Sequence, residues 1–387
     1  VNASKWAKSP FELDKTTEPG KLIARGTEDD KGPISTALYA MKSIKDKAIK
    51  LNKRIELYVY MAEESDWAPL EAFIKENTLP QTNITIDAEY PVVTAEKGWG
   101  LLKFSFAKQP VTTNEPYISA FEGGFFASQI PEDAKMVIKN ANKRIIRTLR
   151  ATSGLDRQVK YTFDINGDEL TITAQGKSAH SSKPQEGVNA IPHLAKIAHV
   201  NGITWPNNGA GTLVNFLNAN IGLGLEGKLF GDIAYSDDFM GPMTVSPTVI
   251  KQNEESIDVH VNIRRPKGKS KAQLQQEIND AFNEWQSADN VSAKQLEHYI
   301  GDPFVQDNAP QTQTLLNIFS HYTGIKDAKP IAIGGGTNSR LFPTAVSFGP
   351  SMPGKNYTGH SEHEFITIEQ FKLNLKMYTA AFIELAK

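Results

Sequence analysis

Hydrophobic residues recur with helical spacing directly after Asp30-Lys31-Gly32-Pro33. The apolar members of this pattern are Ile34, Ala37, Leu38, Met41 and Ile44. Spacings of three and four residues place such side chains on one face of an amphipathic helix. Pro33 suits the first turn, because the N–H that proline lacks would have no partner there. The pattern therefore predicts a helix that begins near Lys31.

Short β-rich runs follow this helix and return near the end of the chain. Strands are predicted over residues 55–61, 83–86, 330–333 and 345–348, and a helix over residues 311–319. Alternating strand and helix patterns are typical of a parallel sheet with helices on its faces. A last helix, running toward Leu385, is predicted to open on a capping box at Thr367-Ile368-Glu369-Gln370.

The middle of the chain follows a different pattern. Residues 161–165 and 170–174 flank Asn166-Gly167, and this dipeptide predicts a hairpin because it tolerates the positive φ angles of a type I′ turn. Another strand is predicted over residues 257–263. We interpret the chain as one α/β domain, residues 1–96 and 301–387, interrupted by an inserted α+β domain, residues 97–300.

Composition narrows the chemistry. The chain has 387 residues with 42 Lys and Arg against 44 Asp and Glu, a net charge of −2, so it has no electrostatic case for binding nucleic acid or an anionic membrane. No apolar run is long enough to predict a membrane span. With no cysteine, any metal must be held by His, Asp and Glu. The start, VNASKW, is unlike a signal peptide and suggests a processed or incomplete chain.

Five polar segments follow predicted strands or open predicted helices in the α/β part. They are Thr27–Gly32, Glu63-Glu64, Asp87-Ala88-Glu89, Gly334–Asn338 and His360–His363. In open α/β sheets, ligands bind beyond the carboxyl ends of the strands. Carboxylates gathered there repel one another unless a cation neutralises them, and carboxylate and imidazole groups suit Zn²⁺ or a similar divalent ion.

The candidate metal ligands are Asp29, Glu64, Asp87 and His360. Glu63 and Glu64 are expected to differ in role, because neighbouring side chains at the end of a strand face opposite ways. One can bind a metal while the other moves a proton.

Each segment also has an ordinary interpretation when it is taken alone. The Glu63-Glu64 pair can be solvated, and Asp29-Asp30 can compensate a helix dipole. The Gly334–Gly336 run can be a plain loop, and it lacks the ending of a phosphate-binding P-loop. His180, within Gly176–Ser182, can be structural. The joint order of the segments and their places at strand ends favour a metal site.

The order and spacing of these motifs resemble the co-catalytic zinc exopeptidases, which include carnosinases, succinyl-diaminopimelate desuccinylases, acetylornithine deacetylases and PepV-type bacterial dipeptidases. The resemblance covers essentially the whole chain and is strongest to the PepV-type enzymes. It implies a three-layer α/β catalytic domain with an inserted α+β lid, and two zinc ions, with Mn or Co as alternatives. The implied metal ligands are Asp29, Glu64, Asp87 and His360.

The resemblance also implies roles for the remaining motifs. Glu63 would act as the catalytic base, and His180 on the lid would stabilise the oxyanion. Arg264 and the loop of Gly334, Gly335, Gly336 and Thr337 would hold the substrate's carboxylate. The family's first ligand, in a His-x-Asp segment, would precede Val1. Two positions depart from the family pattern: His363 stands where Asn is common, and Ser128 where PepV-type enzymes have Asn.

The expected activity is hydrolysis of short peptides, most simply dipeptides, because relatives with Asp at the position of Asp87 tend to be dipeptidases or aminopeptidases. An N-acyl amino acid deacylase and a catalytically inactive metal- or peptide-binding relative are the alternatives. The size of the lid predicts a monomer, since PepV-type enzymes replace a dimer partner with a doubled lid. The resemblance suggests a cytoplasmic protein and leaves export open.

Overall fold

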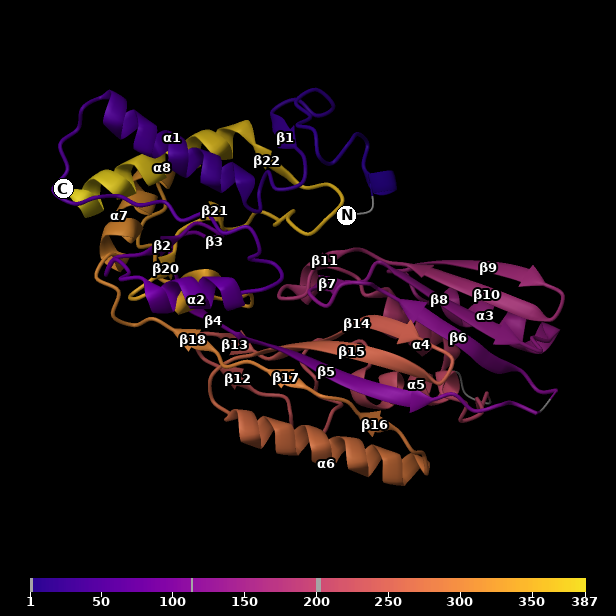
Figure 1. Ribbon diagram of the computed structural model, residues 1–387. Helices are drawn as coiled ribbons and strands as arrows, with labels where there is room; N and C mark the ends of the chain where they lie inside the picture. Colours follow the sequence, from indigo (N-terminus) through magenta and orange to yellow (C-terminus); the bar gives the residue numbers. More distant parts are fainter. Residues whose placement is uncertain (1–2, 113, 200–202) are drawn as a thin grey trace. The chain divides into compact units, whose positions relative to one another are not determined.

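The computed structural model describes residues 3–112, 114–199 and 203–387 (Figure 1). The chain divides into two compact units. Unit 1 comprises Val1–Glu96 and Phe304–Lys387, and unit 2 comprises Lys97–Pro303. The chain therefore leaves unit 1 once and returns to it once, which is the connectivity of an inserted domain.

Unit 1 is built on a mixed five-stranded sheet. Its strands are β18 (Phe304–Val305), β4 (Val93–Glu96), β20 (Val346–Ser347) and β2 (Ile84–Thr85) in that order, with β19 (Ile331–Ile333) also paired to β4. The pairs β19–β4 and β2–β20 are parallel, whereas β18 and β20 run antiparallel to β4. The prediction of a parallel sheet is therefore wrong for the pairs β18–β4 and β20–β4. One reason is that β4 leads out into unit 2 and the chain returns beside it as β18.

Helices and smaller strand pairs complete unit 1. They are α1 (Lys31–Asp46), α2 (Ala68–Glu76), α7 (Thr312–Thr323), α8 (Ile368–Ala386), the pair β1 (Lys21–Ile23) and β22 (Phe365–Thr367), and the pair β3 (Ala88–Glu89) and β21 (Pro350–Ser351). Figure 1 shows α1 and α8 together above the short strands β2 and β20. One apolar core joins α1, α7 and α8 to the sheet, with Tyr90, Phe319 and Phe348 fully buried in it.

The predicted helices form, with two local differences. Helix α1 begins at Lys31 and buries Ala37, but Leu38, expected on the same face, is 54% exposed. At the start of α8 the hydroxyl of Thr367 accepts a hydrogen bond from the Gln370 N–H at 3.1 Å. The Gln370 side chain donates instead to the Pro350 carbonyl, so only half of the expected capping box forms.

The predicted buried strand over residues 55–61 is wrong. This segment belongs to no sheet, and Val59 and Met61 are 50% and 91% exposed. A β-rich sequence forms a strand only where another strand supplies hydrogen-bond partners, and the described strands of unit 1 do not pair with it. Glu63-Glu64 therefore lies in a turn ahead of α2 and not at the end of a strand.

Unit 2 is an α+β unit around a nine-stranded sheet. The strand order is β16-β5-β15-β14-β6-β8-β10-β9, with β17 also paired to β5. These strands are β5 (Gly98–Ala107), β6 (Tyr117–Gly123), β8 (Asp133–Lys139), β9 (Lys160–Asn166), β10 (Glu169–Gln175), β14 (Thr244–Gln252), β15 (Ser256–Arg265), β16 (Lys294–Gln295) and β17 (Tyr299–Ile300). The remaining strands and α-helices are β7 (Gln129–Ile130), β11 (Ala179–His180), β12 (Ser236–Asp237), β13 (Gly241–Pro242), α3 (Lys143–Ser153), α4 (Ala190–Ala198), α5 (Ala210–Phe216) and α6 (Lys271–Asp289).

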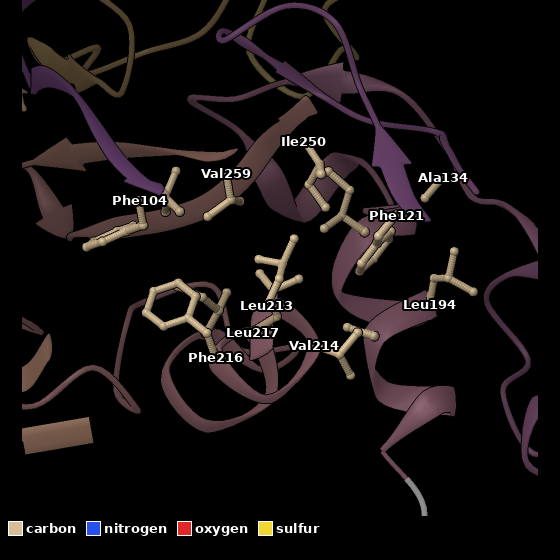
Figure 2. Packing of buried hydrophobic residues seen from close by; sticks show 14 of the residues in the cluster. Phe104, Phe121, Ala134, Leu194, Leu213, Val214, Phe216, Leu217, Ile250 and Val259 are labelled. Atoms are coloured by element: carbon tan, nitrogen blue, oxygen red, sulfur yellow. The ribbon is translucent and has the colours of Figure 1, made fainter. Parts of the chain in front are cut away.

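The core of unit 2 lies between this sheet and helices packed on it. Figure 2 shows Phe104 of β5, Phe121 of β6 and Val259 of β15 facing Leu213 and Phe216 of α5, all of them fully buried. The predicted β9–β10 hairpin forms, but Asn166 pairs with Glu169. The two turn residues are therefore Gly167 and Asp168, and not the expected Asn166 and Gly167. Gly167, the first of the two, has φ 63°, a backbone angle that glycine adopts readily.

Candidate metal centre

Three of the predicted metal ligands come together in unit 1. Asp29, Glu64 and His360 each offer one ligand atom, and these atoms all lie within 4.8 Å of one another. The Nε2 atom of His360 is 2.5 Å from Oε1 of Glu64 and 3.0 Å from Oδ2 of Asp29. In the described part of the chain, this is the one group of three or more such residues that could share an ion.

The three ligands come from segments far apart in the sequence. Asp29 lies in the turn between β1 and α1, where the Gly32 N–H closes on the Gly26 carbonyl at 3.0 Å. A Cβ atom on Gly32 would stand 2.1 Å from the Thr27 carbonyl oxygen, so this tight turn requires glycine. His360 lies in the loop after β21 with φ 61°, a backbone region that is costly for a residue other than glycine and is typical of functional sites.

The electrostatics of the cluster show an excess of buried negative charge. Burial, followed by the charges of Glu64 and Asp29, raises the pKa of Glu63 to about 8. Burial and the neighbouring Asp29 charge also raise the pKa of Asp30, to about 6, and that of Asp87. Burial lowers the pKa of His360, but its hydrogen bonds to Asp29 and Glu64 outweigh this effect and raise that pKa to about 10. A bound cation would relieve all of these repulsions.

Glu63 differs from Glu64 in its surroundings. The Glu64 carboxylate is at the cluster, and its side chain is 53% exposed. Within the described residues, the Oε1 atom of Glu63 is buried and has no hydrogen-bond partner. The Glu63 carbonyl accepts a hydrogen bond from the Trp67 ring N–H at 2.5 Å, which fixes the turn ahead of α2. The two neighbouring carboxylates therefore have different environments, although strand alternation is not the cause.

Asp87 follows β2 and lies outside the three-residue cluster. Its pKa is raised first by burial and then by the charges of Asp29, Glu63, Asp30 and Glu64. Asp87 therefore shares the electrostatic environment of Asp29 and Glu63. His363, in contrast, is exposed and its Nε2 atom lies 2.8 Å from Oε1 of Glu18, at the surface of unit 1.

Sequence reasoning missed Glu364, the residue that holds the Asp29 turn. Its fully buried carboxylate accepts hydrogen bonds from the backbone N–H groups of Gly26, Glu28 and Asp29 at 2.8–2.9 Å. It also forms an ion pair with Arg25 at 2.8 Å. Nothing in local spacing marks this glutamate, because its partners lie more than 330 residues away in the sequence.

Tyr357 is a second support that sequence reasoning missed. Its hydroxyl donates a hydrogen bond to Oδ2 of Asp29, the same oxygen that faces His360. Burial and the Asp29 charge raise the pKa of this phenol, so it stays a donor. Groups that hydrogen-bond to a ligating carboxylate fix its orientation and tune metal affinity.

The predicted glycine loop, Gly334 to Thr337, follows β19 in unit 1. The buried carboxylate of Glu96 accepts hydrogen bonds from the hydroxyls of Thr337 at 2.6 Å and Ser339 at 2.8 Å. It also accepts one from Nε of Arg340 at 3.2 Å. The end of the loop is therefore fixed by a carboxylate at the last residue of β4.

The other two predicted residues, His180 and Arg264, lie in unit 2. Nδ1 of His180 is 2.6 Å from the Ser182 hydroxyl. Arg264 is buried and donates to the Ser181 hydroxyl at 3.0 Å. Ser181 and Ser182 therefore link His180 to Arg264 within unit 2. Ser128, the position where PepV-type enzymes carry Asn, accepts a hydrogen bond from the Ser181 N–H through its carbonyl.

Comparison with known proteins decides the family. The sequence pattern of peptidase family M20/M25/M40 matches residues 1–384. The chain belongs to this family. The resemblance stated from the motifs and the prediction of a peptidase are thereby confirmed.

Individual relatives agree with this assignment. The M20 chain is 28% identical over 386 residues to a β-Ala-Xaa dipeptidase of Lactobacillus delbrueckii subsp. lactis, covering 99% of this chain and 79% of the relative. Its fold resembles a metallo-carboxypeptidase of Sulfolobus solfataricus, with TM-score 0.51, 13% identity and coverage of 100% and 82% of the two chains. It also resembles the dipeptidase Dug1p of Saccharomyces cerevisiae, with TM-score 0.50, 16% identity and coverage of 98% and 76%.

These likenesses confirm the predicted fold class, an α/β catalytic domain of the zinc-exopeptidase type with an inserted α+β domain. No helix among the described residues has the length and apolar character needed to cross a membrane.

Proposed function

We propose that this M20 chain is a metal-dependent dipeptidase whose catalytic centre is the cluster of Asp29, Glu64 and His360 in unit 1. One observation carries the proposal: two carboxylates and an imidazole converge within 4.8 Å, beside a second glutamate, Glu63, with a buried oxygen that accepts no hydrogen bond from the described residues. Two oxygen ligands and one nitrogen ligand, with further positions open, form a donor set that suits catalytic zinc.

The proposed metal assignment follows the arrangement of charges. Asp29, Glu64 and His360 would hold one ion, while Asp29 and Asp87 would contribute to a second. Such ions polarise a peptide carbonyl and lower the pKa of bound water. Zinc fits the mixture of carboxylate and imidazole best, and manganese or cobalt fits the same ligands.

Residues of unit 1 supply the proton transfer. Glu63 would take a proton from the attacking water and return it to the leaving amine, because its Oε1 atom is buried and accepts no hydrogen bond from the described residues. Its pKa, raised to about 8 by burial and by the neighbouring carboxylates, keeps it basic enough to accept a proton, and a bound cation would favour its ionised form. Two hydrogen bonds hold Asp29 in place: its N–H donates to the Glu364 carboxylate, and its own carboxylate accepts from the Tyr357 hydroxyl.

The remaining assigned residues act on the substrate. We assign the stabilisation of the developing oxyanion to His180, whose Nδ1 lies 2.6 Å from the Ser182 hydroxyl. Arg264 would pair with the substrate's carboxylate, and the loop of Gly334, Gly335, Gly336 and Thr337 would contact the peptide backbone. The relative that matches nearly the whole chain is named a β-Ala-Xaa dipeptidase, and this name supports a dipeptide as the substrate.

A substrate panel tests the proposal. The purified zinc-loaded protein should hydrolyse unblocked dipeptides, such as β-alanyl and α-aminoacyl dipeptides, faster than N-acetyl amino acids. Turnover of the N-acetyl amino acids without turnover of dipeptides would make the protein a deacylase. Zinc binding without turnover of either class would make it an inactive binding relative. Light scattering is expected to give a monomer of about 42.7 kDa.

A further inference from the structure

The chain passes between the two units at two points that lie side by side. It leaves unit 1 after Glu96, the last residue of β4, and returns at Phe304, the first residue of β18. Glu96 and Phe304 are partners in the antiparallel pairing of these two strands (Figure 1). The chain has no cysteine and therefore no disulfide, so these two points are the covalent links between the units. A shift of one unit against the other must be accommodated beside Glu96 and Phe304.

Both ends of the glycine loop, Gly334 to Thr337, also lie at Glu96. Ile333, which directly precedes the loop, is the partner of Glu96 in the parallel pairing of β19 with β4. Thr337, the last residue of the loop, donates its hydroxyl hydrogen bond to Oε1 of Glu96 at 2.6 Å. Both residues are buried, and a hydrogen bond away from water is electrostatically stronger. A Cβ atom on Gly336 would approach no atom closer than 3.8 Å, so the middle of the loop depends on these two ends for its position.

Arg340 connects the same loop to the returning strand. It lies in a 3₁₀ helix, Asn338–Leu341, that follows the loop directly. Its Nε atom is 3.2 Å from Oε2 of Glu96. Its guanidinium carbon is 6.0 Å from the centre of the Phe304 ring, a distance at which an aromatic face still attracts a cation. The Arg340 side chain therefore lies against both strands by which the chain crosses between the units.

We propose that Glu96 and Arg340 are positioning residues that couple the crossing between the units to the glycine loop. A peptide held by the loop then favours one arrangement of the two units, and that arrangement raises the affinity of the loop for the peptide. Such a coupling acts equally in both directions. The part that concerns the peptide rests on the proposed function, because that function assigns the loop to the substrate. The link between the loop and the crossing does not rest on it.

The distance between the units tests this link without a substrate. Because the chain has no cysteine, Lys45→Cys on α1 and Lys271→Cys on α6, both exposed positions, can carry a donor and an acceptor dye for single-molecule fluorescence of the zinc-loaded protein. Arg340→Leu should broaden the distribution of transfer efficiencies, and Arg340→Lys, which keeps a cation beside Glu96 and Phe304, should restore it. A role confined to the stability of unit 1 would not change this distance. An unchanged distribution in Arg340→Leu would overturn the proposal.

Two further variants complete this test. Arg144→Leu removes an exposed arginine from α3 of unit 2 and should leave the distribution unchanged. Arg340→Leu leaves the buried Glu96 carboxylate without its cation, which can prevent folding. Glu96→Gln/Arg340→Leu removes both charges together and also the contact with Phe304, so it should broaden the distribution as well. A folded double variant with the distribution of the unchanged protein would overturn the proposal.

Steady-state kinetics of the zinc-loaded protein without dyes tests the part that concerns the peptide. Arg340→Leu should raise KM for a free dipeptide about ten-fold, a usual size for a coupling between two sites. It should change kcat much less, because Arg340 is not part of the metal centre. Arg340→Lys should recover most of the loss. A KM equal to that of the unchanged protein in Arg340→Leu would contradict the coupling to substrate.

The two measurements separate this inference from the function on which part of it rests. If no dipeptide is hydrolysed and Arg340→Leu still broadens the distribution, the proposed function is wrong and the link between the loop and the crossing stands. If dipeptides are hydrolysed and the distribution is unchanged in Arg340→Leu, the proposed function stands and the coupling is wrong.

Discussion

Units 1 and 2 each bury a cluster of like charges, but the charges have opposite sign. In unit 1, Asp29, Glu63 and Asp87 share one negative environment that burial and mutual repulsion make unfavourable. In unit 2, Lys97 and Arg264 are both buried, and burial and the Arg264 charge lower the pKa of Lys97. Burial is therefore unfavourable for the charged groups of both units.

Both clusters oppose folding unless groups of opposite charge balance them. A buried cluster of like charges lowers the stability of the fold, whether the charges are negative or positive. Proteins retain such a loss of stability where ligand binding compensates the buried charges. A metal ion would balance the carboxylates of unit 1, which the proposed metallopeptidase activity requires.

The largest expected effect concerns the base. Glu63→Gln keeps the shape of the side chain and removes its ability to accept a proton, so kcat for dipeptide hydrolysis should fall by about 10²–10⁴-fold. Zinc affinity, measured by calorimetry, should change far less, because Glu63 is not assigned as a ligand. Glu71→Gln, an exposed change on α2, is the control. A loss of zinc affinity as large as the loss of kcat would indicate that Glu63 is a metal ligand.

Glu364 should matter most for stability. Glu364→Ala leaves Arg25 and three backbone N–H groups of the Asp29 turn without their buried acceptor. Removal of one partner of such a buried pair costs about 3–5 kcal/mol, to be measured by urea unfolding of the metal-free protein. His363→Ala, at the exposed neighbour, should cost less than about 0.5 kcal/mol. A small effect of Glu364→Ala would mean that the turn holds itself.

Tyr357 should tune the metal site without holding the fold. Tyr357→Phe removes the hydroxyl that donates to Asp29 and leaves the ring in place. Loss of such a supporting contact reduces metal affinity by about 10–100-fold, which a zinc competition titration measures. The variant should unfold at nearly the same urea concentration. Unchanged zinc affinity would argue against Asp29 as a ligand.

The acidic cluster also predicts how stability depends on pH. Folding raises the pKa of Glu63 from 4.5 to about 8 and that of Asp30 from 3.8 to about 6. The folded state therefore binds protons more tightly than the unfolded state, and these groups contribute stability below about pH 4 that is lost as pH rises through 6 to 8. The Tm of the metal-free protein should fall across this window, and zinc should raise Tm most at pH 8. The opposite trend would mean that the carboxylates are not crowded.

Gly336 offers the smallest and most specific change. A Cβ atom there would approach no atom closer than 3.8 Å, the nearest being on Arg340 and Glu96, so the fold alone does not require this glycine. Gly336→Ala should leave Tm almost unchanged and raise KM for dipeptides a few-fold if the loop contacts substrate. An unchanged KM would remove Gly336 from the binding site.

Local patterns in the sequence predicted much of this structure. The spacing around Pro33 located α1, and Thr367 marked the start of α8, because helix starts depend on residues close by in the chain. The strand predicted over residues 55–61 failed, since a strand depends on partners that may come from anywhere in the chain. Local turn chemistry placed the β9–β10 hairpin within one residue, at Gly167.

The candidate site shows the same difference between residues that local motifs reveal and residues that act through long-range contacts. Asp29, Glu64 and His360 were chosen from motif order, and the structure brings them within 4.8 Å. Glu364 and Tyr357 were missed, because their role consists of contacts to residues more than 320 positions away. Lys97 was missed as well, since a lysine at the start of a strand gives no sign in the sequence that it will be buried beside Arg264.

Metal reconstitution tests the central claim most directly. The protein is stripped with a chelator, zinc is returned in measured equivalents, and hydrolysis of a free dipeptide is followed at each step. We expect no hydrolysis in the stripped protein and activity that rises with bound zinc until the site is filled, with no recovery in Glu63→Gln. Equal hydrolysis with and without metal, or full zinc binding without any hydrolysis, would contradict the account.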